Sequence, residues 1–300
     1  MTVLVNLIVA LGMLYAVPAG LRLIDPAGLR RAARAWPLAA APGALCLWLP
    51  RGGAATALAC LYAAAALALL GAGGARLWRG LTRARSSGVP FPAAEVAVLT
   101  ALASPSVSAA ALVAERAGYR LFGFDLDVLA LTVPHFHFAG FTAALVAGLV
   151  CRSAPGYLAR GAAYSVPAGT LLVLLGYFVD DWAELLGAVV LTAGMWTVAL
   201  VTWRELRPAA RDRVTGTLLG TSAAVLVATM LLALWWAAGE ATGIVHPTLT
   251  WMAATHGLGN ALGFALCSLL AWRRLTAGRD PADGNPGTRD PSPLPLTVTP

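Results

Sequence analysis

Long blocks of apolar residues restrict what this chain can fold into more than any other feature of its sequence. Most blocks contain about 20 residues, the length that a helix needs to cross the hydrocarbon core of a bilayer. The short alternating segments of a membrane β-barrel are not visible in the sequence. We therefore predict an all-α fold, a polytopic bundle of about nine transmembrane helices, over the ranges 2–21, 35–50, 54–75, 95–114, 128–150, 161–179, 182–203, 215–238 and 248–272.

Charge is sparse in this chain and all of its strongly basic residues are arginine. Charged residues make up 12% of the 300 residues, whereas a soluble domain carries about 25%. The formal net charge is +7, but the arginines lie between apolar blocks rather than in a basic stripe on a soluble domain. We therefore expect no nucleic-acid partner and take the lipid bilayer to be the main partner; the sequence points to no particular protein partner.

The arginines alternate between the two sides of the predicted bundle. Eighteen of the 21 arginines fall on one side and three on the other. Because arginine accumulates in cytoplasmic loops, we predict the N-terminus outside and the C-terminus in the cytoplasm. The short, proline-containing block at 35–50 must also cross, since otherwise the arginine-rich loops that follow the first and third blocks would fall on opposite sides.

The chain divides into a helical bundle and a tail. Residues 1–277 are predicted to form the transmembrane bundle. Residues 278–300 are rich in Pro, Gly and Asp, cannot bury a core, and are predicted to be a disordered cytoplasmic tail. The abundant alanine and the exclusive use of arginine indicate a G+C-rich bacterial genome, so the predicted location is the bacterial plasma membrane, as a multi-pass protein.

Histidine is the most informative residue type inside the predicted spans, because polar groups within a membrane are costly and are default candidates for a functional site. His135 and His137 lie about 12–15 Å below the outer end of the fifth block. His256 has nearly the same depth in the ninth block, and Asn260 follows one turn later on the same face. We predict that His135, His137, His256 and Asn260 form a ligand or ion site in the outer half of the membrane.

The two neighbouring histidines do not point the same way on an ideal helix. Residues two apart are separated by about 200° around the helix axis. His135 and His137 can approach one point only if Pro134 distorts that turn. The ligand spacing identifies no metal or cofactor, which stay unknown; the candidate metal ligands are His135, His137 and His256.

An acidic group lies between the sixth and seventh blocks on the predicted outer side and consists of Asp180, Asp181 and Glu184. Carboxylates and imidazoles together suit a cation, a proton relay or a metal, whereas a solvated loop is the simpler explanation of these acids alone. The chain contains no HExxH, GxSxG or P-loop motif. We therefore predict no catalytic residue and favour a protein that is not an enzyme.

Two segments resemble the YndJ-like family of bacterial membrane proteins. The segment PHFHFAGF at 134–141 resembles one signature of that family, with Phe138 where tyrosine is usual. The segment MAATHGLGNALGF at 252–264 resembles its second signature, and their order and separation also fit. The resemblance implies a multi-spanning membrane protein, sometimes described as transporter-like, without an established substrate. It places the following residues at motif positions: His135, His137, Gly140, Phe141, Thr255, His256, Gly257, Asn260 and Gly263.

Three functions are compatible with this pattern. The first is a transporter or permease for a small solute or cation, since interrupted helices around a midplane cavity recur in transporters. The second is a membrane metal- or haem-binding oxidoreductase that uses the intramembrane histidines as ligands. The third is a structural or regulatory membrane component, in which the histidines only hold helices together.

Overall fold

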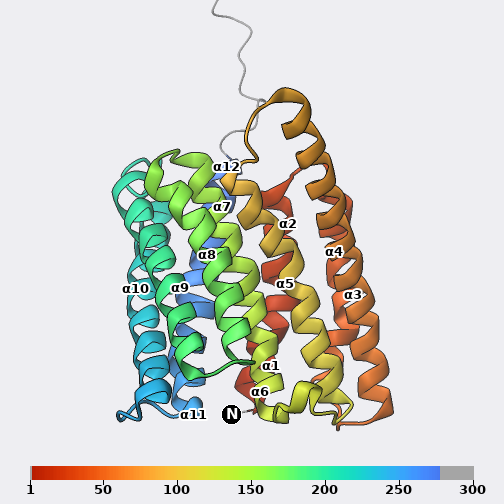
Figure 1. The fold of residues 1–300 in the computed structure, drawn as a ribbon. Helices are drawn as coiled ribbons and strands as arrows, with labels where there is room; N and C mark the ends of the chain where they lie inside the picture. The colour runs from red at the N-terminus through yellow and green to blue at the C-terminus, as the bar shows by residue number, and fades with distance from the viewer. Residues whose placement is uncertain (1, 278–300) are drawn as a thin grey trace, which may run out of the picture.

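The computed structural model describes residues 2–277, and all regular secondary structure in that range is helical. Figure 1 shows rods that lie side by side in one bundle, and successive rods run in opposite directions. Their bounds are α1–η1–α2 (Thr2–Leu11, Gly12–Ala16, Val17–Ile24), α3 (Arg30–Cys46), α4 (Gly53–Ser87), α5 (Ala93–Arg116), α6–η3–α7 (Leu126–His135, Phe136–Thr142, Ala143–Ser153), α8 (Tyr157–Gly176), α9–η4 (Asp181–Val201, Thr202–Leu206), α10 (Arg213–Thr242) and α11–η5–η6–α12 (Leu249–Met252, Ala253–Gly257, Gly259–Leu266, Cys267–Ala277).

Eight of these rods are long and apolar enough to cross a membrane, so the prediction of an all-helical membrane bundle is confirmed. The remaining rod, α3, has 17 residues and is not among the eight. A ninth crossing by α3 and the outward orientation of the N-terminus therefore stay predictions. The predicted tail at 278–300 lies outside the described residues.

The structure corrects the predicted bounds of two helices. The second helix begins at Arg30 and ends at Cys46, rather than covering 35–50. The third continues to Ser87, twelve residues beyond the predicted end at 75. The prediction treated arginine as a loop marker, but arginine and alanine are both strong helix formers. The helix ends only where Gly88 adopts a left-handed backbone with φ of 67°, a common way for a helix to stop.

The two ends of the bundle differ in arginine content. Only three of the described arginines, Arg51, Arg116 and Arg120, lie at the end marked N in Figure 1. We call this the arginine-poor end and the opposite one the arginine-rich end. The alternation along the sequence thus corresponds to a separation in space, which is the distribution that the positive-inside rule uses.

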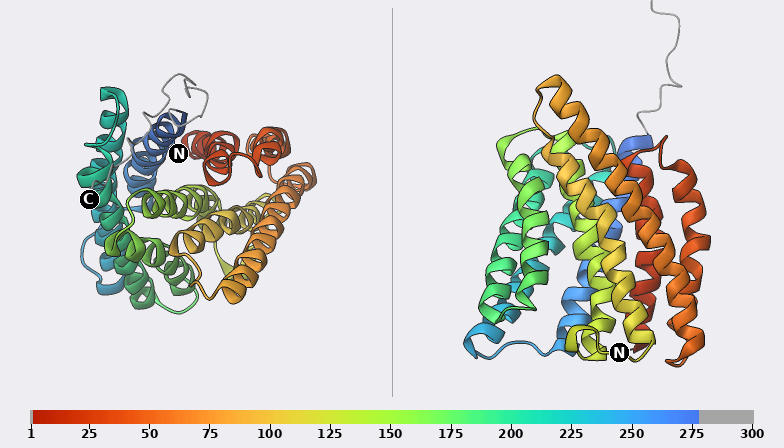
Figure 2. Two further views of the ribbon diagram at one scale, coloured as in Figure 1. Left: turned by 90° about the horizontal axis from the view of Figure 1, so that it is seen from above. Right: turned by 45° about the vertical axis from the view of Figure 1, so that its right-hand side comes forward.

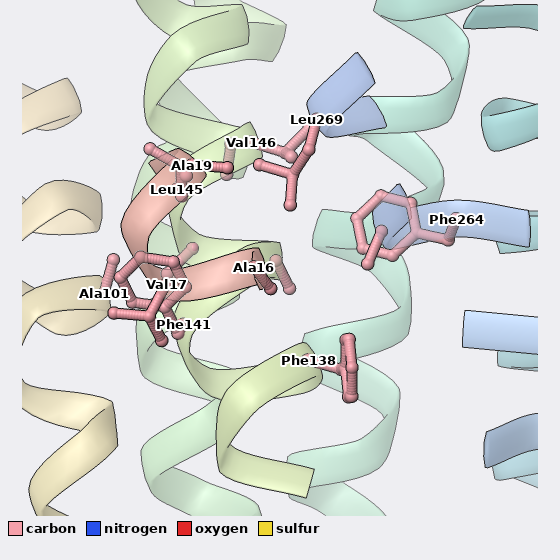
Figure 3. Close-up of a cluster of buried hydrophobic side chains, with 14 of the residues drawn as sticks. Ala16, Val17, Ala19, Ala101, Phe138, Phe141, Leu145, Val146, Phe264 and Leu269 are labelled. Carbon is pink, nitrogen blue, oxygen red and sulfur yellow. The ribbon is translucent and has the colours of Figure 1, made fainter. Parts of the chain in front are cut away.

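The rod α6–η3–α7 forms the axis of the bundle. Of its most apolar stretch 83% is buried, compared with 28–56% for the other seven membrane-length rods, and Figure 2 shows it surrounded by other helices. Figure 3 shows apolar side chains that this rod shares with two others in one cluster: Phe138 and Phe141 from this rod, Ala16 and Val17 from the first, and Phe264 from the last. Both histidines of the first motif are therefore carried by the most enclosed helix.

Ion pairs tie several helix ends together at the arginine-rich end. The Glu95 carboxylate on α5 accepts hydrogen bonds from Arg76 of α4 at 2.7 and 3.1 Å and from Arg152 of α7 at 2.7 Å. Arg152 also donates to the carbonyl of Ile24, the last residue of α2, at 3.3 Å. Bidentate arginine–carboxylate pairs of this kind fix geometry as well as charge, so they set how α2, α4, α5 and α7 are spaced.

Helices α8 and α9 pack with almost no space between their backbones. A Cβ atom on Gly169 would lie 2.4 Å from the backbone nitrogen of Leu191, and one on Gly187 would lie 2.5 Å from that of Val173. Small residues allow this approach in membrane helices, where packing rather than hydrophobicity drives association.

Gly187→Ala is therefore expected to push α8 and α9 apart and to lower stability by about 1–3 kcal/mol, the usual cost of overpacking. Thermal unfolding of the purified protein in detergent measures the effect. The control is Gly71→Ala on α4, where an added Cβ meets nothing within 4 Å and the higher helix propensity of alanine should leave stability equal or slightly improved. Equal melting temperatures for the two variants would contradict the close packing of α8 and α9.

Candidate functional site

Three rods change from α-helical to π-helical geometry at the level of the candidate site. These π-helical segments are η1, η3 and the consecutive pair η5 and η6. In a π turn each hydrogen bond spans five residues, and such turns occur often at functional sites. Segments η1, η3 and η6 pack against one another. The two motifs that the sequence singled out, 134–141 and 252–264, thus lie on π-helical segments that meet inside the bundle.

His137 is completely buried and uses both ring nitrogens. Its Nδ1 lies 2.7 Å from the carbonyl oxygen of Val133 and 2.9 Å from the hydroxyl of Ser108 on α5. Its Nε2 lies 2.8 Å from the hydroxyl of Tyr62 on α4. The Ser108 hydroxyl in turn donates to the same Val133 carbonyl at 2.8 Å. One imidazole therefore connects α4, α5 and the central rod.

These distances determine which nitrogen of the neutral His137 ring carries the proton. A carbonyl oxygen can only accept a hydrogen bond, so the Nδ1 atom beside Val133 must be the donor. Nε2 is then the acceptor, and the Tyr62 hydroxyl donates to it. Every donor and acceptor in this buried network has a partner, as buried polar groups require.

The first rod is shaped to fit around His137. A Cβ atom on Gly12 would lie 2.7 Å from the Cβ of His137, so only glycine permits this approach of η1. The indole of Trp36 on α3 donates to the carbonyl of Met13 at 2.9 Å. Thr142 donates its hydroxyl to the His137 carbonyl at 2.9 Å. Side chains thus satisfy backbone carbonyls at two of the π-helical segments, as the interior of a membrane protein demands.

His256 belongs to a second hydrogen-bonded group on the last rod. Its Nδ1 lies 2.8 Å from the carbonyl oxygen of Thr229 on α10, and its Nε2 lies 3.0 Å from the side-chain amide nitrogen of Asn260. The amide oxygen of Asn260 accepts from the Thr229 hydroxyl at 2.8 Å. By the same reasoning the neutral ring carries its proton on Nδ1 and accepts at Nε2. His256 and Asn260 are only partly buried, unlike His137.

His135 faces a different environment from His137, although only one residue separates them. Its ring packs edge-to-face on Phe136, with ring centroids 5.8 Å apart. It is the last residue of α6, directly before η3, and η3 packs against η6 of the rod that carries His256. It is partly exposed, and no residue in the described part of the chain forms a hydrogen bond with its ring. The structure therefore joins His256 to Asn260, places His137 in a separate network, and leaves His135 outside both hydrogen-bonded groups.

The acidic group at the arginine-poor end divides into exposed and buried members. Asp180 caps α9 by accepting a hydrogen bond from the Ala183 backbone nitrogen at 2.7 Å, and Asp181 beside it is exposed. Glu184 is buried and forms a side-chain hydrogen bond with Tyr177.

Two further residues join this group from α10 and the loop that follows it. The imidazole of His246 lies 3.3 Å from the carboxylate of Glu240. Burial, followed by the charges of Glu184 and Glu240, raises the pKa of Tyr177 well above its usual range, so its hydroxyl stays protonated.

Between residues 2 and 277, no carboxylate pairs with His135, His137 or His256. The acidic group is therefore a second feature, separate from the intramembrane histidines.

Metal binding would have to rely on few side chains. The described residues contain no group of three or more His, Cys, Asp or Glu that is placed to hold a metal ion. The nearest arrangement is the pair His135 and His256. His256 has the orientation typical of metal-ligating histidines, in which Nδ1–H donates to a backbone carbonyl and Nε2 is the acceptor. In this conformation Asn260 occupies that acceptor.

Sequence analysis missed the partners that make this site. Tyr62, Thr229 and Gly12 were not singled out. Tyr62 and Thr229 are polar groups in long apolar stretches, which is the signal that could have found them. Their pairing with particular histidines depends on which helices are neighbours, and the hydropathy pattern does not contain that information.

Comparison with known protein families identifies one match, which covers most of the chain. The family model described as "YndJ-like protein" matches residues 7–264. The chain belongs to the YndJ-like family. The match to the family includes both motifs, covers η1 and η3 completely, and ends within η6. Searches among curated proteins and among solved structures each found no significant match.

Tyr62→Phe is expected to lower stability by about 1–3 kcal/mol, because it leaves the buried His137 Nε2 without a donor. The melting temperature in detergent measures the loss. Tyr164→Phe is the matched control, since Tyr164 is 50% exposed and removing its hydroxyl should change little. If Tyr62→Phe melts like the wild type, the Tyr62–His137 hydrogen bond does not hold the bundle together.

Proposed function

We propose that this member of the YndJ-like family is a transporter- or permease-like protein of the bacterial plasma membrane. Its binding site would lie between the end of α6 and the segments η5 and η6, in the half of the bundle that we predict to be outside. The observation that supports the proposal is a set of partly exposed polar side chains beside π-helical segments that pack together: His135 ends α6 next to η3, His256 lies in η5, and Asn260 lies in η6, which packs against η3.

Irregular helices give a membrane protein backbone and side-chain groups that can bind a solute at depth. Transporters place such segments around a midplane site, and irregular backbone is tolerated there only where protein or a water-filled cavity surrounds it. Here the ring of His135, which no described residue hydrogen-bonds, and the hydrogen-bonded pair of His256 and Asn260 are the polar groups that such a site would use.

The acidic group at the arginine-poor end supports a cation as the substrate. Asp180, Asp181, Glu184 and Glu240 lie at the arginine-poor end of the bundle, from which a solute would reach the proposed site, and a surface of one charge sign concentrates ions of the opposite sign. A cation would pass from these carboxylates to the imidazoles, which are good ligands for borderline and soft cations. The same surface would disfavour an anionic solute.

Uptake by sealed proteoliposomes tests this proposal. We expect the wild type to accumulate at least one member of a panel of monovalent cations, divalent cations and small neutral solutes above empty vesicles. His135→Ala should reduce that uptake by about tenfold or more, the effect of losing a polar contact to a charged ligand. His246→Ala, which removes the histidine paired with Glu240 outside the site, is the matched control and should retain most activity.

Two results would count against transport by this site. Failure of the whole panel to enter the vesicles would remove the reason to call the protein a transporter. Equal loss of uptake in His135→Ala and His246→Ala would show that histidine removal acts through the fold or the mouth rather than through the proposed site. The melting temperature of each variant separates these two explanations.

A metal- or haem-binding oxidoreductase is the second candidate, and the Nδ1-to-carbonyl orientation of His137 and His256 favours it. Metal analysis and an absorption spectrum of the gently purified protein test this function. If it is correct, a stoichiometric metal or a haem band is present in the wild type and is lost in His256→Ala but kept in His246→Ala. Colourless, metal-free wild-type protein would contradict it.

A further inference from the structure

Helix α4 is longer than the bilayer that it crosses. Its 35 residues correspond to about 52 Å at 1.5 Å per residue, whereas the hydrocarbon core is about 30 Å thick and the whole bilayer about 40–45 Å. Figure 1 shows its last turns standing above the neighbouring helices at the arginine-rich end. Measured from Gly53, Arg79 and Arg83 lie about 39 and 45 Å along the axis, which is the level of the lipid headgroups.

The arginines of this projecting end continue the lipid-facing side of the helix. Leu61 and Leu67 on the membrane-crossing part are 58% and 59% exposed, so they face lipid. Arg79 follows Leu61, and Arg85 follows Leu67, after about five complete turns of 3.6 residues. Each arginine is exposed and lies above a lipid-facing leucine. Trp78, 67% exposed, lies just before them, as tryptophan does at membrane interfaces.

Within residues 2–277, these arginines have no anionic partner. The segment 77–92 contains no acidic residue, and among the described carboxylates none pairs with Arg79, Arg83 or Arg85. Arg76, one turn earlier, differs because it is held by Glu95 and by the more distant Asp25. Guanidinium groups bind phosphate oxygens through paired N–H donors.

We propose that the projecting end of α4, with Arg79, Arg83 and Arg85, binds the phosphate headgroups of anionic phospholipids in the leaflet at the arginine-rich end. The ligand is a bilayer lipid rather than a soluble phosphate, because Arg79 and Arg83 lie at headgroup height, and Arg79 and Arg85 lie above lipid-facing leucines. This surface is independent of the histidine site and of the proposed transport function.

Spin-labelled lipids measure this binding directly. The full chain is reconstituted in phosphatidylcholine with a trace of spin-labelled phosphatidylglycerol or spin-labelled phosphatidylcholine, and electron spin resonance gives their relative association with the protein. The wild type should prefer phosphatidylglycerol, and R79Q/R83Q/R85Q should weaken the preference by about fivefold for each arginine in contact. R79K/R83K/R85K should keep most of it, and high salt should reduce the wild-type preference.

The control removes the same amount of charge from the same end of the bundle. R30Q/R31Q/R34Q changes three exposed arginines at the start of α3 and should retain most of the phosphatidylglycerol preference. An equal loss in the two triple variants would assign the effect to net charge and overturn the α4 surface, as would a wild type without any preference. Inorganic phosphate added to the buffer should not compete; if it does, the site binds soluble anions instead.

Discussion

The hydrogen bonds of the buried His137 ring set how the centre of this bundle is assembled. A polar ring at this depth has to find a donor and an acceptor within the protein, because the bilayer offers neither. Tyr62 and Ser108 supply them from α4 and α5, and the contact requires η1 to approach as closely as Gly12 allows. Four rods therefore meet at one imidazole, and Gly12 lets the first of them approach it.

The two histidines of the first motif have different surroundings because of this arrangement. Protein groups hydrogen-bond both ring nitrogens of His137, whereas no described residue hydrogen-bonds the partly exposed ring of His135. The alternative of a purely structural protein accounts for His137 but leaves the partly exposed His135 without a role.

The helices were largely predictable from the sequence, whereas the contacts between them were not. Apolar blocks located all the rods, because burial in lipid requires about 20 apolar residues per crossing. The predicted end of α4 was wrong, because the prediction gave the charge of its Ala- and Arg-rich last turns more weight than their helix propensity. The π-helical segments were not predicted at all, because a π turn depends on packing against neighbours that the sequence does not name.

That His135, His137, His256 and Asn260 form a site stays a prediction, whereas the structure shows how these residues are grouped. Their depth in the predicted helices selected them, and the last two form a hydrogen bond. Depth in the helix could not show which of His135 and His137 is held by hydrogen bonds within the protein, since that depends on Tyr62, which lies on another helix. The acidic residues Asp180, Asp181 and Glu184 were found as a group, but their separation from the histidines required the three-dimensional structure.

The π-helical geometry of η3 also restricts which mutations the central rod can tolerate. A π turn accommodates one residue more than an α turn, so every side chain beyond it is displaced by about 100° from its α-helical direction. Deleting a single residue between Phe136 and Thr142 would restore an ordinary helix and turn the face of α7 that now packs into the core toward other neighbours. Substitutions in this segment change one contact at a time, whereas a one-codon deletion would alter the register of half of the central rod.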